Sequence, residues 1–111
     1  MGAATDRMSA GLVLVVRLFI HPGREAEFRR FETEAARIMA RHGGRIERAI
    51  RPTGPPDQQP LPHEIHVLSF PDAARLDAYR TDPELVALAE LRQAAIARTE
   101  VIVGVDAEPY R

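Results

Sequence analysis

The feature that most limits what this chain can fold into is the run Leu12–Ile20, in which every residue except Arg17 is apolar. Valine and isoleucine are frequent in it, which favours a β-strand. Side chains alternate between the two faces of a strand, so a strand without polar alternation needs cover on both faces. The run is also too short to span a bilayer. We therefore expect a sheet that buries this strand from both sides.

Helices are predicted from apolar spacing and from capping residues. A first helix should follow Pro22-Gly23 and end at Gly43-Gly44, because apolar residues recur between them at helical intervals. Pro71-Asp72 opens a short helix that carries Leu76 and Tyr79. Asp82-Pro83-Glu84 supplies an N-cap, a first-turn proline and a first-turn acid for a longer helix. We expect this longer helix to run to about Arg98 and to carry Leu85, Leu88, Leu91, Ala95 and Ile96.

Further strands are expected over residues 45–51, 63–70 and 101–105, with a proline-rich hairpin loop over residues 52–62. Polar residues in 45–51 indicate an edge strand. The order is β-α-β-β-α-β, that of a ferredoxin-like α+β fold. Right-handed crossovers give an antiparallel sheet with its helices on one face. The bare face would be a large apolar patch, so we expect a homodimer through the sheet face.

Composition and charge exclude several classes of function. The 111 residues include 15 basic and 16 acidic side chains, a balance that does not attract nucleic acid or an anionic membrane. All the basic residues are arginine, which is typical of a GC-rich bacterial genome. The lack of Cys excludes disulfides and thiol nucleophiles and fits a cytoplasmic location. No signal peptide or membrane-spanning segment is recognisable.

The length fits one domain. We expect residues 1–11 to form a disordered leader, with either Met1 or Met8 as the native start. The domain should cover residues 12–106, and residues 107–111 should form a C-terminal tail.

Several short motifs together carry a family resemblance. They are RHGGR (residues 41–45), VLSFPD (67–72), YRTDPEL (79–85), LR (91–92) and VIVGV (101–105). With them the chain resembles the DUF1330 family, within the superfamily of dimeric α+β barrels that also contains the antibiotic-biosynthesis monooxygenases. The segment HPGREAEF (21–28) is similar to the monooxygenase branch. The resemblance implies a face-to-face homodimer with a pocket between sheet and helices.

The same resemblance bears on chemistry. Monooxygenases of the superfamily oxidise flat aromatic substrates without metal or flavin, so no cofactor is expected. Haem-degrading relatives use a Trp, and this chain has none. His63 and His66 lie three apart on a strand and therefore face opposite sides, which disfavours a metal site.

The candidate ligand-binding residues are Arg17, His66, Tyr79 and Arg92. A charge inside an apolar strand needs a partner, so Arg17 points either to a pocket or to a structural ion pair with Glu64, Glu100 or a second subunit. His66 shares a strand face with apolar residues and could titrate near neutral pH there, or be a hydrogen-bonded core histidine. Arg92 could reach the same cavity or extend to water. Tyr79 could form a pocket wall or simply pack at a helix end.

Three functions remain open from the sequence. The first is binding of a small organic ligand in a pocket between sheet and helices. The second is a cofactor-independent monooxygenase or isomerase that acts on an aromatic or polyketide-like substrate, with His66 as the proton-transfer group. The third is a structural or interaction module whose own side chains fill the space. A cavity between sheet and helices would separate the third from the other two.

Overall fold

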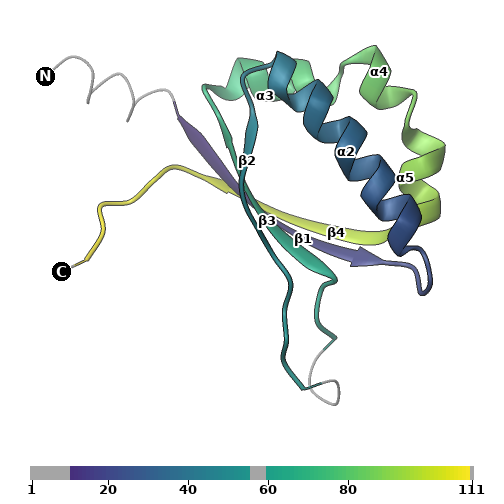
Figure 1. The fold of residues 1–111 in the computed structure, drawn as a ribbon. Coiled ribbons are helices and arrows are strands. Elements are labelled where there is room, and N and C mark those ends of the chain that lie inside the picture. The colour runs from purple at the N-terminus through teal and green to yellow at the C-terminus, as the bar shows by residue number, and fades with distance from the viewer. Residues whose placement is uncertain (1–10, 56–59, 111) are drawn as a thin grey trace, which may run out of the picture.

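The computed structural model describes residues 11–55 and 60–110 and confirms the predicted α+β fold (Figure 1). Its strands are β1 (Leu12–Ile20), β2 (Arg45–Ile50), β3 (Glu64–Phe70) and β4 (Ile96–Gly104). Its helices are α2 (Glu25–Arg41), α3 (Ala73–Arg80), α4 (Pro83–Val86) and α5 (Ala89–Ala95). None of these helices is long and apolar enough to cross a membrane.

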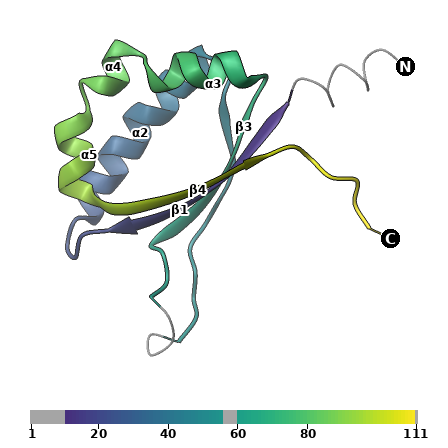
Figure 2. The ribbon, with the colours of Figure 1, turned by 180° about the vertical axis from the view of Figure 1, so that it is seen from behind.

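The strands form a four-stranded antiparallel sheet in the order β2-β3-β1-β4. The apolar strand β1 lies inside the sheet between β3 and β4, and β2 is an edge strand as predicted. All four helices lie on one side of the sheet, in the front view and in the view from behind (Figures 1 and 2). This is the ferredoxin-like arrangement that the order of elements predicts.

The core lies between the sheet and α2. Alternate residues of β1, namely Leu14, Val16 and Leu18, point toward the helices and are buried. Across from them, α2 contributes the buried side chains Phe28, Phe31, Ala35, Ile38 and Met39. The helical spacing of these residues is what places them on a single buried face.

The predicted long helix after Asp82 is wrong in two respects. It is divided into α4 and α5, because the chain tightens at Ala87 and Leu88, where the Leu88 N–H donates to the Leu85 carbonyl. It also ends at Ala95 rather than near Arg98, and β4 begins at Ile96 instead of residue 101. The strand starts early because Arg98, Thr99 and Glu100 pair with β1, a long-range contact that local sequence does not reveal.

The loop between β2 and β3 and the segment after β4 have no regular secondary structure in the described residues. Residues 51–55 and 60–62 have no regular secondary structure, as the prolines predict, and residues 56–59 lie outside the described part. The predicted leader also lies outside it, except for Gly11. Residues 105–110 extend beyond β4 without helix or strand.

The sheet face opposite the helices is apolar at its centre. Val15 pairs with Val67 on one side and Ile102 on the other, so the three side chains share this face. Ile102 is 67% exposed, and no described helix covers it. We call this surface the open face, defined by Val13, Val15, Ile65, Val67 and Ile102.

The glycine pair after α2 has a distinct role at each position. Gly43 adopts a φ of +75°, the left-handed conformation that ends helices and favours glycine. Gly44 is close to the core: a Cβ there would lie 2.5 Å from the Phe70 ring and 2.6 Å from Met39 Cγ. The absence of a side chain at Gly44 therefore lets the turn pack directly on the core.

This close approach yields a first prediction. Gly44→Ala should lower the free energy of unfolding by about 1–3 kcal/mol, the usual cost of overpacking a filled core. Gly54→Ala is the control, because a Cβ at that position would meet the end of the exposed Leu61 side chain and not the core. Urea denaturation of both variants measures the difference, and equal unfolding midpoints would contradict the packing described for Gly44.

Candidate functional site

A cavity of about 240 Å³ lies between the sheet and the helices. Most of its wall is apolar and comes from β1, β3 and α2, including Leu14, Phe31 and Leu68. Arg92 and Val101 line the cavity and are also solvent-exposed, so the cavity reaches the surface between α5 and β4. The space between sheet and helices is thus not filled by the protein's own side chains.

His66 is the buried polar residue of the core, with 4% of its surface exposed. Its Nε2 donates to Glu64 Oε1 over 2.7 Å, and its Nδ1 lies 3.6 Å from Glu32 Oε1. The second Glu64 oxygen accepts a hydrogen bond from Arg51. Burial acts to raise the pKa of Glu64, but hydrogen bonds and charges from His66 and Arg51 hold it below its ordinary value. A chain of polar contacts therefore links the exposed Arg51 to the cavity wall.

Glu32 is the carboxylate that lines the cavity. Burial raises its pKa, and the nearby Glu64 charge adds to the rise, while His66 and Arg92 oppose it. Within residues 11–55 and 60–110 the polar group nearest its oxygens is His66 Nδ1 at 3.6 Å, beyond hydrogen-bond range, and 19% of the Glu32 side chain stays exposed. Glu32 thus presents unused acceptor capacity to the cavity.

Further polar groups at the cavity come from Tyr79, Arg80, Arg92 and Thr99. Burial raises the pKa of Tyr79 to about 12. The Glu32 charge adds to this rise, and the Arg92 charge opposes it. The Tyr79 hydroxyl therefore stays protonated and can donate a hydrogen bond at neutral pH. Arg92 donates through Nη2 to Thr99 over 2.9 Å, which leaves its other N–H groups for further partners.

Three of the four residues predicted from the sequence line this cavity: His66, Tyr79 and Arg92. Their part in ligand binding stays a prediction. Arg17 does not line this cavity, because it lies on the opposite sheet face between the cavity-lining Val16 and Leu18. Its Nη1 forms an ion pair with Glu100 Oε1 at 3.0 Å, the structural alternative weighed for it. An all-apolar strand gives no alternation from which its face could be assigned.

Glu32 was missed from the sequence. It lies four residues after Phe28 and three before Ala35, so helical spacing puts it on the buried face of α2. That position within an apolar stripe was the available signal.

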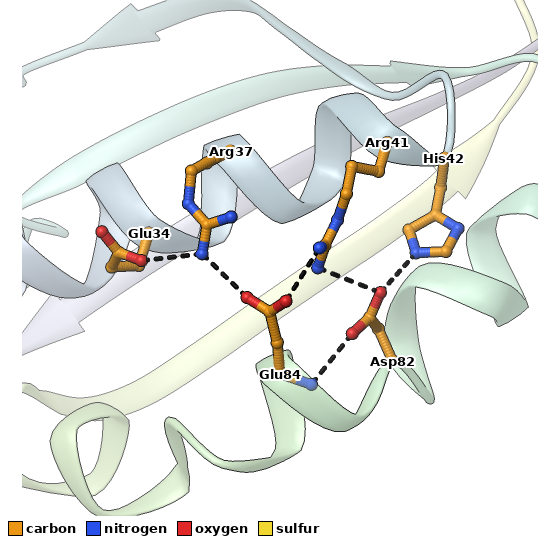
Figure 3. Close-up of polar contacts among 6 residues, drawn as sticks. All are labelled: Glu34, Arg37, Arg41, His42, Asp82 and Glu84. Atoms are coloured by element: carbon orange, nitrogen blue, oxygen red, sulfur yellow. Dashed lines mark hydrogen bonds and ion pairs between the residues drawn. The ribbon is translucent and has the colours of Figure 1, made fainter.

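A network of surface hydrogen bonds and ion pairs joins α2 to the start of α4 (Figure 3). Leu85 of α4 forms part of the cavity wall. Glu84 accepts hydrogen bonds from Arg37 and Arg41 of α2, at 2.9 and 2.8 Å. His42 Nε2 donates to Asp82 Oδ2 over 2.8 Å, and this bond helps hold the pKa of Asp82 below its ordinary value. Single surface ion pairs stabilise little, but together these tie α4 to α2 and keep Leu85 against the cavity.

Fold and site together define a ferredoxin-like α+β protein with an internal cavity that has one polar side. The sequence model of one family, a domain of unknown function (DUF1330), matches residues 14–105, and the chain belongs to this family. No curated protein matches the sequence.

Solved structures share the fold at low sequence identity. A protein of unknown function from Rhodopseudomonas palustris is 15% identical, with a TM-score of 0.74 over 97% of this chain and 93% of the other. SnoaB, a cofactor-independent oxygenase from Streptomyces nogalater, is 18% identical, with a TM-score of 0.67 over 90% and 96%. A dabb family protein from Mesorhizobium loti is 20% identical, with a TM-score of 0.60 over 89% and 99%. These similarities confirm the fold.

The environment of Glu32 yields a second prediction. Its folded pKa lies above the ordinary value of 4.5, so the folded protein binds this proton more tightly than the unfolded chain. The contribution of Glu32 to stability should therefore fall as pH rises from 4.5 through the raised pKa, and stay reduced above it. Glu32→Gln should remove this loss and be more stable than the wild type at pH 8.

Urea denaturation between pH 4.5 and pH 8 measures this effect. Glu25→Gln, an exposed position on the same helix, is the control and should follow the wild type. If the free energy of unfolding changes with pH in the same way for the wild type and Glu32→Gln, the argument that burial raises the pKa of Glu32 is contradicted.

Proposed function

We propose that this protein binds a small organic ligand in the cavity between sheet and helices. The observation that carries the proposal is a largely apolar cavity with polar groups whose hydrogen-bonding capacity the described residues do not use. Among the described residues, the group nearest the Glu32 oxygens is His66 Nδ1 at 3.6 Å, and Arg92 has N–H groups beyond the one bound to Thr99. Both side chains keep some exposed surface, so a ligand with matching polar atoms can replace water at them.

The cavity volume limits the ligand to a small molecule. A dry cavity of about 150 Å³ is enough for benzene. A volume of about 240 Å³ accommodates one substituted ring and not an extended polycyclic compound. Apolar walls favour the ring, and the polar side of the cavity favours one or two oxygen substituents.

The proposed assembly is a homodimer through the open face. A second copy placed on Val15, Val67 and Ile102 would cover apolar surface that the helices leave exposed. A stable interface of at least about 1,000 Å² removes enough apolar surface to exceed the entropy cost of association. Arg17 and Glu100 lie on the same face and supply polar contacts at one end of it.

The second candidate function is a cofactor-independent oxygenase or isomerase. The specific observation in its favour is His66, a histidine at the cavity wall with a carboxylate beside each ring nitrogen. A carboxylate partner orients an imidazole and stabilises its protonated form, which suits proton transfer to or from a ligand. The fold that the chain shares with SnoaB makes this a reasonable class to test.

The ligand proposal yields a third prediction. Among one-ring phenols, quinols and aromatic acids, at least one compound should raise the melting temperature of the wild type. At about one hundred times its Kd, a ligand adds about 2.7 kcal/mol of stability. Arg92→Leu should lose most of this shift because it removes cavity donors, while Arg29→Leu, at an exposed position of α2 outside the cavity lining, should keep it.

Differential scanning fluorimetry measures both variants under the same conditions. A wild type that no compound stabilises would favour the structural module over ligand binding. If both arginine variants lose the ligand-induced rise in melting temperature to the same extent, the proposal that the ligand binds in the cavity is contradicted.

The assembly proposal yields a fourth prediction. Ile102→Glu should shift the protein from a dimer to a species near the 12.3 kDa of one chain, because it puts a charge into the proposed interface. Val86→Glu is the control, since Val86 is 60% exposed on α4 and away from the open face. Size-exclusion chromatography with light scattering distinguishes the two. A monomeric wild type at micromolar concentration would rule out the dimer.

A further inference from the structure

Opposite charges line the cavity from two helices that pack against each other. Glu32 belongs to α2 and Arg92 to α5, and the Arg92 charge acts against the rise in the pKa of Glu32. Arg80 of α3 also lines the cavity. An anion bound beside Glu32 would be repelled by its carboxylate, and a cation would be repelled by the arginines. A neutral ligand that donates to the carboxylate and accepts from the guanidinium satisfies both.

The neighbours of Glu32 leave its oxygens available to a ligand. His66 already donates through Nε2 to Glu64, and its other nitrogen is 3.6 Å from Glu32. Arg92 is bound through Nη2 to Thr99. The Tyr79 hydroxyl lies in the fields of both Glu32 and Arg92. A hydroxyl group in the cavity would therefore meet an acceptor with no competing donor bound to it among the described residues.

We propose that Glu32 sets the ligand class of this cavity: neutral one-ring compounds with a hydroxyl group, a phenol or an enol, bound with the O–H donating to the Glu32 carboxylate and an oxygen accepting from Arg92. Carboxylate ligands are excluded because they would place a second negative charge beside Glu32. This inference rests on the proposed ligand-binding function and adds the chemistry that the ligand must have.

Three probes of similar size test the proposal. They are 4-methylphenol, which has the hydroxyl; para-xylene, in which a methyl group replaces it; and benzoate, which carries a charge. NMR titration of the ¹⁵N-labelled full-length protein at pH 8 gives a Kd for each. The wild type should bind 4-methylphenol at least about tenfold more tightly than para-xylene, the usual effect of a hydrogen bond to a charged group. Benzoate should bind more weakly than 4-methylphenol by a similar factor.

Glu32→Gln tests the carboxylate itself. The amide keeps the size and an acceptor oxygen but removes the negative charge, so Arg80 and Arg92 then line the cavity without the Glu32 carboxylate. Benzoate should bind this variant at least about tenfold more tightly than the wild type, while 4-methylphenol changes less. Glu25→Gln, on the exposed side of the same helix, should leave all three affinities unchanged.

The outcomes separate the two proposals. If no probe binds the wild type, the proposed function fails, and this inference fails with it. If probes bind but para-xylene matches 4-methylphenol, or benzoate binds the wild type as tightly as Glu32→Gln, ligand binding stands and the role of Glu32 is overturned. The comparison of probes on the wild type decides this even if the variant does not fold.

Discussion

The architecture depends on one constraint, the need to cover β1 on both faces. Leu14, Val16 and Leu18 on one face are buried under α2, and this burial supplies much of the core. On the other face, Val13 and Val15 pack among the described residues against their neighbours within the sheet. Helices on one side and a proposed second copy on the other are the two ways in which this strand can be shielded from water.

The cavity exists because the helical layer does not fill all the space above the sheet. The break at Ala87 and Leu88 turns the chain so that α4 places Leu85 at the cavity and α5 packs on α2. Arginines of α2 hold Glu84 from outside (Figure 3). Polar side chains in such a space are costly unless they have partners. His66 has Glu64 as its partner, whereas Glu32 keeps part of its side chain exposed.

Much of the fold and part of the site were predictable from the sequence. Asp72 and Asp82 cap their helices as predicted, each accepting a backbone N–H. His66 was recognisable because a histidine between apolar strand positions must face a protein interior. The face that Arg17 occupies was not predictable, because its strand offers no polar alternation. The start of β4 was missed because Arg98 and Glu100 look like the end of a surface helix, although they lie on the open face.

The sequence by itself determined the order of strands and helices, the caps and the need to cover β1, because these depend on residues that are close together along the chain. Only the tertiary structure decided which face Arg17 occupies and that Glu32, His66 and Arg92 line one cavity. Those facts depend on strand register and on the packing of α2 against α5. Contacts between distant segments are set by the whole fold, and no local pattern encodes them.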